Sequence, residues 1–402
     1  MGPSSASHDL AIIGGGLGGS ALAFAMARHG FRVLVIEREE AFKDRIRGES
    51  MYPWGTAEAH ALGLGELLRD SCALEIRFMD TYAGPMRTRR DFIETTPQQL
   101  PCMNFIHAEM QEVLLKAAAS AGAEVRRGDS VTQVTTSPGT APRITVSHGG
   151  TTQEITARLV VGADGRGSRA RGWGGFTVQK DPHRLFIGGV LFEGGAVPRD
   201  AVSQIPSFGL GAIFFPQTKD RVRAYVLYHH EVRDARLQGP ADLPQLLALA
   251  QQAGTPAEWL ADARPIGPLA TFEGAHHWVD HPYRDAVVLI GDAAATSDPC
   301  FGQGLSLTLR DVRTLRDKLL GESDWDAAGH AYAEAHDRYY AVVHSAEDWF
   351  TRLFMEQGEA ADARRQKMMP LIMADPTRVP DVLVSGPNQP LGDAERIRFL
   401  GE

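Results

Sequence analysis

A β-α-β unit near the amino terminus constrains the fold of this chain more than any other stretch of its sequence. An apolar run at 8–13 leads into the loop GGGLGGS at 14–20, and an alanine-rich segment at 21–29 is typical of a helix. A second apolar run at 31–36 ends at Glu37. A strand, a glycine-rich turn, a helix and a second strand in this order predict a Rossmann-like α/β domain with a parallel sheet.

The loop of this unit predicts a dinucleotide site. Glycines in the pattern G-x-G-x-x-G permit a tight turn and let the backbone approach a pyrophosphate at the helix amino terminus. Glu37 would accept hydrogen bonds from both ribose hydroxyls, and its charge would repel a 2′-phosphate, which favours FAD or NAD over NADP. The residues predicted to bind the cofactor here are Gly14, Gly16, Leu17, Gly18, Gly19, Glu37 and Arg38.

Two later motifs also follow the end of a predicted strand. One is GADG at 162–165, which is followed by Ser168 and Arg169. The other lies within 285–311, where an apolar run ends at Gly291-Asp292 and a turn of small residues precedes a predicted helix. A carboxylate beside a helix amino terminus places acceptors next to free N–H donors. The cofactor-binding residues predicted from these motifs are Asp164, Gly165, Gly291, Asp292, Pro299, Gly302, Gly304 and Leu305.

Composition excludes several classes of partner. The 402 residues carry a formal net charge of −9, which argues against a nucleic-acid-binding surface of clustered Lys and Arg. No apolar run of about 18 residues occurs, so no transmembrane helix is expected. Three cysteines far apart predict reduced thiols, with neither a disulfide framework nor a metal site. The amino-terminal residues lack the pattern of a secretory signal, and we expect a cytoplasmic protein.

The middle of the chain changes character. Aromatic residues, prolines and alternating apolar patterns increase between 172 and 280, and 208–230 predicts a β-hairpin with its turn near 217–220. We expect a mostly antiparallel sheet inserted into the first domain. The expected division is a nucleotide-binding domain at 8–80, 104–171 and 281–322, a substrate domain at 172–280 with an insertion from 81–103, and a helical carboxyl-terminal region at 323–402.

Local patterns predict the remaining elements. Helices are expected at 56–69, 108–120, 241–253, 303–320 and over most of 324–370, and strands at 74–80, 123–127, 131–136, 143–147, 153–161 and 286–290. Residues 81–101 contain three prolines and predict irregular chain.

The order and spacing of the three motifs over residues 8–320 resemble the single-component FAD-dependent monooxygenases of the aromatic hydroxylase type, relatives of para-hydroxybenzoate hydroxylase. The resemblance implies that Gly14–Gly19 hold the FAD pyrophosphate, Glu37 the ribose and Asp292 the ribityl chain. It implies that Asp164 serves both FAD and transient NAD(P)H, and that Pro299 and Gly302 lie along the flavin ring. The single glycine loop agrees with a resident FAD and a nicotinamide without a Rossmann site of its own.

The resemblance carries three further residues over to the cofactor. Arg47 matches a basic position that contacts FAD or guards its ring, and Gln111 matches a polar position that reaches the phosphates. Val131 matches a strand residue whose backbone meets the adenine. The chain departs from the family at Ala295 and His107, where His and Arg are common, so the walls of the substrate pocket are less predictable than the flavin site.

The same resemblance implies the reaction. NAD(P)H would reduce FAD, O₂ would form a flavin C4a-hydroperoxide, and an aromatic or polycyclic small molecule would be hydroxylated or epoxidised. The amides of Gly304 and Leu305 would stabilise negative charge on reduced flavin. The hairpin at 208–230 would cover the substrate, and alternation lets only one of Phe214 and Phe215, and only one of Tyr228 and His229, face the pocket. Phe214 and Tyr228 are expected to bind the substrate, and His229 or Tyr225 to act as the base.

Alternative functions share these motifs. A reductase or dehydrogenase of the geranylgeranyl reductase type would consume no oxygen into product, and a non-catalytic flavin-binding protein would show no substrate-stimulated NAD(P)H oxidation. A flavin-dependent halogenase is disfavoured, because no lysine occurs between Lys43 and Lys116 and no two tryptophans are close together. The choice between NADH and NADPH, reduction by a partner flavin reductase, and a monomer or homodimer all stay open at the level of sequence.

Overall fold

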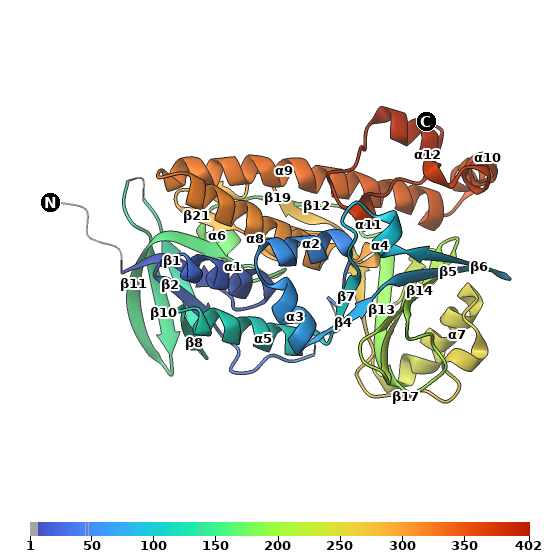
Figure 1. The fold of residues 1–402 in the computed structure, drawn as a ribbon, viewed down its shortest axis with the longest axis horizontal. Helices are drawn as coiled ribbons and strands as arrows, with labels where there is room; N and C mark the ends of the chain where they lie inside the picture. Colours follow the sequence, from blue (N-terminus) through green and yellow to red (C-terminus); the bar gives the residue numbers. More distant parts are fainter. Residues whose placement is uncertain (1–6, 45, 47, 138) are drawn as a thin grey trace.

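The two strands of the amino-terminal β-α-β unit are neighbours in a largely parallel sheet (Figure 1). The computed structural model describes residues 7–44, 46, 48–137 and 139–402. The strands run in the order β20 (Tyr283–Arg284), β21 (Val287–Leu289), β11 (Thr151–Gly162), β1 (His8–Ile13), β2 (Val33–Glu37) and β8 (Glu124–Arg127). All neighbours in this order are parallel except β20 and β21. Two antiparallel strands, β9 (Ser130–Thr135) and β10 (Arg143–His148), extend from β11.

The register of this sheet brings the three motifs to one edge. Ile13 pairs with Ile36 on one side and with Gly162 on the other, and Gly162 pairs with Leu289. The carboxyl ends of parallel strands meet at the same edge, so the glycine loop, Glu37, the GADG segment and the Gly-Asp turn all begin within one row. The sheet itself therefore gathers segments that lie up to about 270 residues apart in the sequence.

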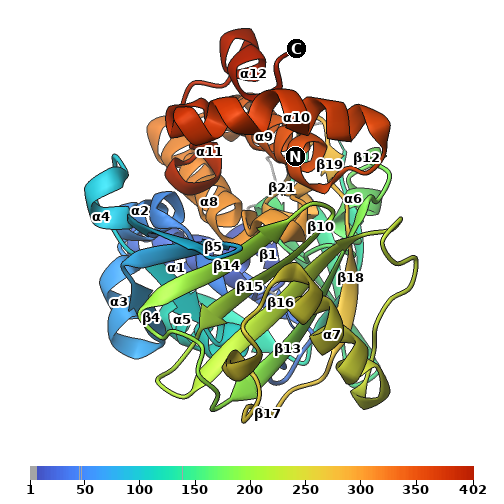
Figure 2. The ribbon, with the colours of Figure 1, turned by 90° about the vertical axis from the view of Figure 1, so that its right-hand side faces the viewer.

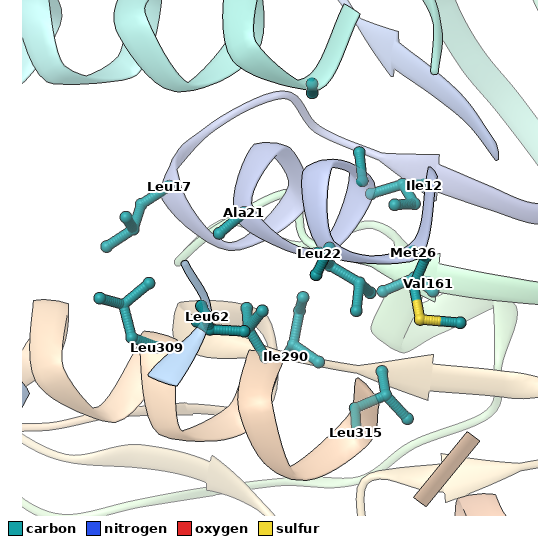
Figure 3. Packing of buried hydrophobic residues seen from close by; sticks show 14 of the residues in the cluster. Ile12, Leu17, Ala21, Leu22, Met26, Leu62, Val161, Ile290, Leu309 and Leu315 are labelled. Carbon is teal, nitrogen blue, oxygen red and sulfur yellow. The ribbon is translucent and has the colours of Figure 1, made fainter. Parts of the chain in front are cut away.

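Three helices pack on one face of the parallel sheet. They are α1 (Leu17–Arg28), α5 (His107–Ser120) and α8 (Gly304–Gly321), which match the helices expected at 21–29, 108–120 and 303–320. Leu22 and Met26 of α1, Val161 of β11, and Leu309 and Leu315 of α8 are fully buried in one core (Figure 3). This core fixes α1 and α8 relative to each other, and both helices begin at the edge where the motifs meet.

The helix expected at 56–69 is wrong as a single element. The chain forms α2 (Pro53–Ala61) and then α3 (Gly65–Ser71). Gly63 lies between them at a φ of +73°, a left-handed conformation that favours glycine and interrupts a helix. The apolar periodicity continues across this break, which is why the sequence pattern predicts one helix.

A second sheet, mostly antiparallel, adjoins the first and is covered by α7 (Leu243–Ala253) (Figure 2). Its order is β17 (Arg264–Pro265), β13 (Leu185–Glu193), β16 (Arg221–His229), β15 (Leu210–Pro216), β14 (Ala201–Ser207), β5 (Phe78–Ala83) and β6 (Met86–Asp91), with β18 (Ala270–Gly274) also paired to β13. The predicted hairpin at 208–230 is confirmed as β15 and β16, with its turn at 217–220.

The expectation of irregular chain at 81–101 is wrong in part. This stretch contains most of the β5–β6 hairpin and the short helix α4 (Phe92–Thr95). Strand β6 is a sheet edge whose arginines lie largely in solvent, so it lacks the apolar alternation from which strands are predicted. Buried Asp80 on β5 accepts hydrogen bonds from Arg87 and Arg89 of β6, which holds the hairpin together.

Smaller elements complete the fold. One small sheet consists of β3 (Ser50–Met51), β7 (Cys102–Phe105) and β4 (Ala73–Ile76), and another of β12 (Val178–Lys180), β19 (His277–Val279) and β22 (Ala295–Thr296). The carboxyl-terminal helices are α9 (Trp325–Phe350), α10 (Glu359–Ala374), α11 (Val382–Ser385) and α12 (Asp393–Leu400), and the short helix α6 (Ala170–Trp173) follows β11.

Helix α9 joins the two halves of the molecule. It runs along both sheets in Figure 1, and its residues enter the hydrophobic core of each half: Tyr332 packs in the first, and Tyr339 and Val343 in the second. The predicted fold class is confirmed: a Rossmann-like α/β unit, an inserted antiparallel sheet and a helical carboxyl-terminal region. Among the described residues, no helix combines the length and the apolar character needed to cross a membrane.

Candidate active site

A cavity of about 480 Å³ extends from the glycine loop to the antiparallel sheet. Most residues predicted from the motifs line it, namely Gly14, Gly16, Leu17, Gly18, Glu37, Arg38, Gln111, Val131, Asp164, Gly165, Gly291, Asp292, Pro299, Gly302, Gly304 and Leu305. Gly19 does not line the cavity and packs behind the loop instead. The prediction for Arg47 lies outside the described residues.

The glycine loop is shaped by close backbone contacts. Gly14 has a φ of +100°, and a Cβ there would lie 2.5 Å from the carbonyl oxygen of Ala163. A side chain at Gly14 would therefore separate the loop from the GADG segment. Gly16 caps helix α1, no side chain bonds to the free amides of its first turn, and no acidic residue lies there. These amides and the helix dipole form a site for an anionic phosphate.

Glu37 is held by the backbone around it. Its Oε2 accepts from the amide of Gly15 at 2.7 Å, and its Oε1 accepts from the amide of Glu39 at 2.8 Å. The carboxylate is nearly buried but lines the cavity. Each carboxylate oxygen can accept two hydrogen bonds, so this group retains capacity for ribose hydroxyls.

Asp164 connects the second motif to the cavity. Its Oδ2 accepts from the amides of Arg169 at 2.7 Å and Ala170 at 3.2 Å, which caps the short helix α6. Its Oδ1 is buried and has no hydrogen-bond partner among the described residues. A buried carboxylate oxygen without a partner is costly, so Oδ1 suits a ligand that donates a hydrogen bond.

Arg171 ties the second motif to the third. Its guanidinium is buried and donates to the carbonyls of Asp292 and Ala293, the first of these at 2.5 Å and the second at 2.7 Å. Burial lowers the pKa of Arg171, and the nearby carboxylates of Asp164 and Asp292 oppose that effect. The side chain thus links the short helix α6 to the Gly-Asp turn through the backbone carbonyls of that turn.

The Gly291–Asp292 turn is also anchored to helix α8. Gly291 has a φ of +58°, and its amide donates to Oδ2 of Asp311 at 2.7 Å. Asp311 is buried and also accepts from the hydroxyl of Tyr339. A Cβ at Gly291 would lie 2.9 Å from Oγ1 of Thr308, so this position requires glycine for both its φ and its surroundings. Asp292 therefore faces the cavity from a rigid support.

The start of α8 offers backbone donors to the same cavity. The helix begins at Gly304, and its cap residue Gln303 makes no side-chain cap. Gln303 is instead fully buried and accepts from the indole of Trp54 at 3.1 Å. The first-turn amides, which include those of Gly304 and Leu305, keep the donor capacity of a helix amino terminus. A group that gains negative charge at this point would be stabilised.

The turn before α8 is compact. Asp298 caps the short 3₁₀ helix Pro299–Phe301 by accepting from the amide of Cys300 at 2.9 Å, and Gly302 follows at a φ of +69°. Burial raises the pKa of the Cys300 thiol well above its usual value. The thiol therefore stays protonated and fills space beside Pro299, as a small apolar side chain would.

The antiparallel sheet contributes an apolar wall to the cavity. Ile187, Ile213, Phe215 and Phe272 line it, and Tyr225 stands among them. The register pairs Ile213 with Tyr225, so both point to the same side of the sheet. This face is suited to a flat, apolar ligand.

Tyr225 belongs to a buried polar group at this wall. Its hydroxyl donates to Oε2 of Glu49, and Nε of Arg223 lies 3.2 Å from Oε1 of Glu49. Nη2 of Arg223 also donates to Asp44 at 2.7 Å. Burial raises the pKa of Glu49, although Arg223 opposes this, and burial raises the pKa of Tyr225 well above its usual value. Tyr225 therefore stays a neutral phenol at physiological pH.

The two residues predicted to bind the substrate do not fit the structure. Phe214 and Tyr228 are fully buried on the opposite face of the sheet, where Phe214 packs edge-on against Trp259 at 5.1 Å. The hydroxyl of Tyr228 donates to the carbonyl of Ala235 at 2.9 Å. The cause is the pleat: Phe215 and Phe214 must face opposite sides, and Phe215 is the one that faces the cavity.

His229 is also not placed to act as the base. It lies at the end of β16 and does not line the cavity, and its Nδ1 accepts from the amide of Glu231 at 3.2 Å. Burial lowers its pKa, with a further contribution from His230. Of the two predicted catalytic residues, the structure brings only Tyr225 to the cavity.

Sequence reasoning missed several residues that line the cavity. Glu49 lies in the segment RIRGES, whose glutamate had no assigned role, and Ile187 and Phe272 lie on strands that carried no motif. Trp173 and Arg166 line the end near the GADG segment. The alternation along 210–216 offered a signal for Ile213 and Phe215, but it could not tell which face meets the cavity.

Comparison with known proteins identifies the family. Residues 7–348 match the FAD binding domain family. The chain is 26% identical over 391 residues to 6-methylpretetramide 4-monooxygenase of Streptomyces rimosus, covering 93% of this chain and 91% of that protein. It is 30% identical over 346 residues to ubiquinone hydroxylase UbiL of Rhodospirillum rubrum, covering 78% and 72%.

The fold agrees with solved structures of flavoproteins. The flavin-dependent halogenase CmlS superposes with a TM-score of 0.77 at 21% identity, covering 98% of this chain and 76% of that one. At this identity the likeness concerns the fold alone. The chain therefore belongs to the FAD binding domain family, as an FAD-dependent oxidoreductase of the aromatic hydroxylase type.

Proposed function

We propose that the protein is a monooxygenase that uses FAD, NAD(P)H and O₂ to hydroxylate or epoxidise an apolar aromatic or polycyclic small molecule. In the hydroxylation, one oxygen atom enters a C–H bond of the substrate, the other leaves as water, and NAD(P)H supplies the two electrons. A single observation carries the proposal: one cavity joins the three motif segments to the apolar face of the antiparallel sheet.

The motif residues would hold the cofactor along this cavity. The free amides of α1 suit the pyrophosphate, and the two oxygens of Glu37 suit the ribose. Asp292 is presented to the ribityl chain by the support of Asp311, and the first-turn amides of α8 would face the ring edge that becomes anionic on reduction. FAD supplies the electron transfer and oxygen activation, and the chain supplies position and electrostatics.

The apolar wall favours a substrate of low polarity. Ile187, Ile213, Phe215 and Phe272 would pack on its carbon skeleton and exclude water from the ring. Tyr225 would meet a substrate hydroxyl as a neutral hydrogen-bonding partner, while its own hydroxyl donates a hydrogen bond to Glu49. Two relatives are named as a 6-methylpretetramide 4-monooxygenase and an aklavinone 12-hydroxylase, which supports an oxygen-inserting reaction here.

The test begins with purified protein and added FAD. Bound flavin should appear in the absorption spectrum, and NADH or NADPH oxidation should accelerate with phenolic and polycyclic compounds. Label from ¹⁸O₂ should enter the product. If NAD(P)H alone does not reduce the flavin, a separate flavin reductase is added, which distinguishes a two-component system. Substrate consumption without ¹⁸O incorporation would contradict the proposal and favour a reductase or halogenase.

A pair of variants tests the binding site itself. Asp292→Ala should lower FAD affinity by about tenfold or more, since it removes charge-assisted hydrogen bonds to the cofactor. Asp262→Ala removes an exposed aspartate that does not line the cavity and should bind FAD as the wild type does. Equal affinity of both variants would contradict the placement of Asp292.

A further inference from the structure

A buried carboxylate on helix α9 contacts the turn that lines the cavity next to the predicted flavin ring. The side chain of Glu347 is fully buried, and its Oε2 accepts from the amide of Asp298 at 2.9 Å. The same Oε2 lies 3.0 Å from Nε2 of His276, which follows β18 of the antiparallel sheet. Glu347 thus joins three elements that are distant in sequence.

The turn it contacts is part of the cavity wall. Ser297, Pro299, Cys300, Phe301 and Gly302 all line the cavity, and Asp298, which caps the 3₁₀ helix in this turn, is the residue whose amide Glu347 accepts. The turn has little freedom to shift. A side chain at Gly274 would lie 2.7 Å from the carboxylate of Asp298, so β18 packs directly against it.

Other titratable groups surround this contact. Tyr340 on α9 has its hydroxyl 3.3 Å from Nδ1 of His276, and Nε2 of His344 lies 2.7 Å from Oδ2 of Asp181 at the end of β12. Asp181, His276 and His344 also have ligand atoms within 4.8 Å of one another. Nε2 of each imidazole already faces a carboxylate, so we interpret the group as a hydrogen-bonded cluster rather than a metal site.

We propose that Glu347 is a positioning residue of the flavin site, which holds the turn 298–302 against the ring by accepting a hydrogen bond from the Asp298 amide while His276 balances its charge. The inference rests on the proposed FAD site, because it assigns a support to the turn that would contact the ring. No contact between Glu347 and the cofactor is required, since Glu347 does not line the cavity.

The electrostatics of the cluster make this role sensitive to pH. Burial raises the pKa of Glu347 to about 7, and the carboxylate of Asp298 adds to this effect. The charge and hydrogen bond of His276 and the hydrogen bond from the Asp298 amide oppose it. Burial alone would lower the pKa of His276, but the charge and hydrogen bond of Glu347 raise it overall. Asp181 also raises the pKa of His276, while His276 helps to lower that of His344. Glu347 therefore changes its protonation state near neutral pH.

The sign of the expected pH effect follows from the protonation state of Glu347, which accepts the hydrogen bond from the Asp298 amide. Above about pH 7 the ionised carboxylate makes a charge-assisted bond to the Asp298 amide, and below it the protonated carboxyl accepts more weakly. FAD affinity should therefore fall as the pH is lowered from about 8 to about 6. In Glu347→Gln no carboxyl titrates at this position, and His276 loses the largest of the contributions that raise its pKa, while Asp298 and Asp181 keep theirs. The pH dependence of FAD affinity should therefore be smaller in this variant than in the wild type.

The experiment measures the FAD dissociation constant by quenching of flavin fluorescence on apo-protein. Glu347→Ala leaves a buried amide without its acceptor and should weaken binding about tenfold, whereas Glu347→Gln retains an acceptor and should stay within about threefold at pH 8. Glu334→Ala, an exposed glutamate on the same helix, is the matched control and should bind as the wild type does. Circular dichroism of the apo-proteins reports whether each variant folds.

The outcomes separate this inference from the function on which it rests. If the wild type binds no FAD, the proposed function itself is overturned. If the wild type binds FAD but Glu347→Ala binds equally well, or Glu334→Ala loses as much affinity, the role of Glu347 is overturned and the flavin site stands. If Glu347→Ala does not fold, the pH profile of Glu347→Gln decides, and a profile identical to the wild type overturns the role.

Discussion

Replacing Gly19 with alanine tests the packing that holds the glycine loop in place. A Cβ at this position would lie 1.9 Å from the carbonyl oxygen of Gly14 and 3.0 Å from Cγ2 of Ile12. Since a carbon and an oxygen do not normally approach within about 3 Å, helix α1 would have to move by about 1 Å from β1. The helix would then lose part of its contact with the sheet beneath it.

The magnitude follows from two opposed effects. Overpacking of this kind costs about 3 kcal/mol, and alanine in a helix interior gains about 1 kcal/mol over glycine, so the net loss should be about 2 kcal/mol of unfolding free energy. The displaced first-turn amides of α1 should also weaken FAD binding about tenfold. Urea denaturation of the apo-protein and fluorescence titration with FAD measure the two effects.

A second glycine provides the control. Gly321 is the last residue of α8, and a Cβ there would meet no atom within 4 Å. Gly321→Ala should leave stability equal or slightly higher and FAD affinity unchanged. If Gly19→Ala matched Gly321→Ala in unfolding free energy and in FAD affinity, the steric argument for the loop would be refuted.

Two further predictions concern the antiparallel sheet. Phe214→Ala should lower the unfolding free energy by about 3–5 kcal/mol with little effect on the KM for substrate. Phe215→Ala should raise the KM for substrate and lower the unfolding free energy by less than Phe214→Ala does. Denaturation and steady-state kinetics measure both quantities, and the reverse pattern would contradict the assignment of faces. Burial raises the pKa of Asp80, but hydrogen bonds from Arg89 and Arg87 bring it below the usual 3.8. Its stabilising contribution is therefore present above pH 3.8 and is lost as the pH falls through the lowered value, so the urea midpoints of wild type and Asp80→Asn should converge in acid.

The sequence predicted the parts of the fold that depend on local pattern. Short apolar strands, the glycine spacing and Glu37 at a strand end were sufficient for the β-α-β unit, because backbone conformation and phosphate binding both depend on neighbouring residues. The hairpin at 208–230 was predictable for the same reason. The edge strand β6 was not, because its arginines lie in solvent and are stabilised by Asp80, a partner on another strand.

The substrate side of the cavity shows where local reasoning ends. Alternation establishes that Phe214 and Phe215 face opposite sides of β15, but either face could have met the flavin motifs. That choice depends on how the antiparallel sheet docks on the parallel one, with α7 covering the face of Phe214. The pairing of Tyr225 with Glu49 joins residues 176 positions apart, and no local pattern encodes such a contact.

The sequence by itself predicted a dinucleotide site with FAD or NAD, since its strand-end motifs each span only a few residues, and the resemblance that these motifs carry implied FAD. The tertiary structure alone decided what lines the cavity and what contacts its wall: which aromatic side chains lie there, which carboxylate Tyr225 donates to, and which helix bonds to the amide of Asp298. The physical reason is how far apart in the sequence the interacting groups lie. Hydrogen-bond donors on a loop belong to its own backbone, whereas a cavity wall consists of side chains brought together by the packing of separate layers.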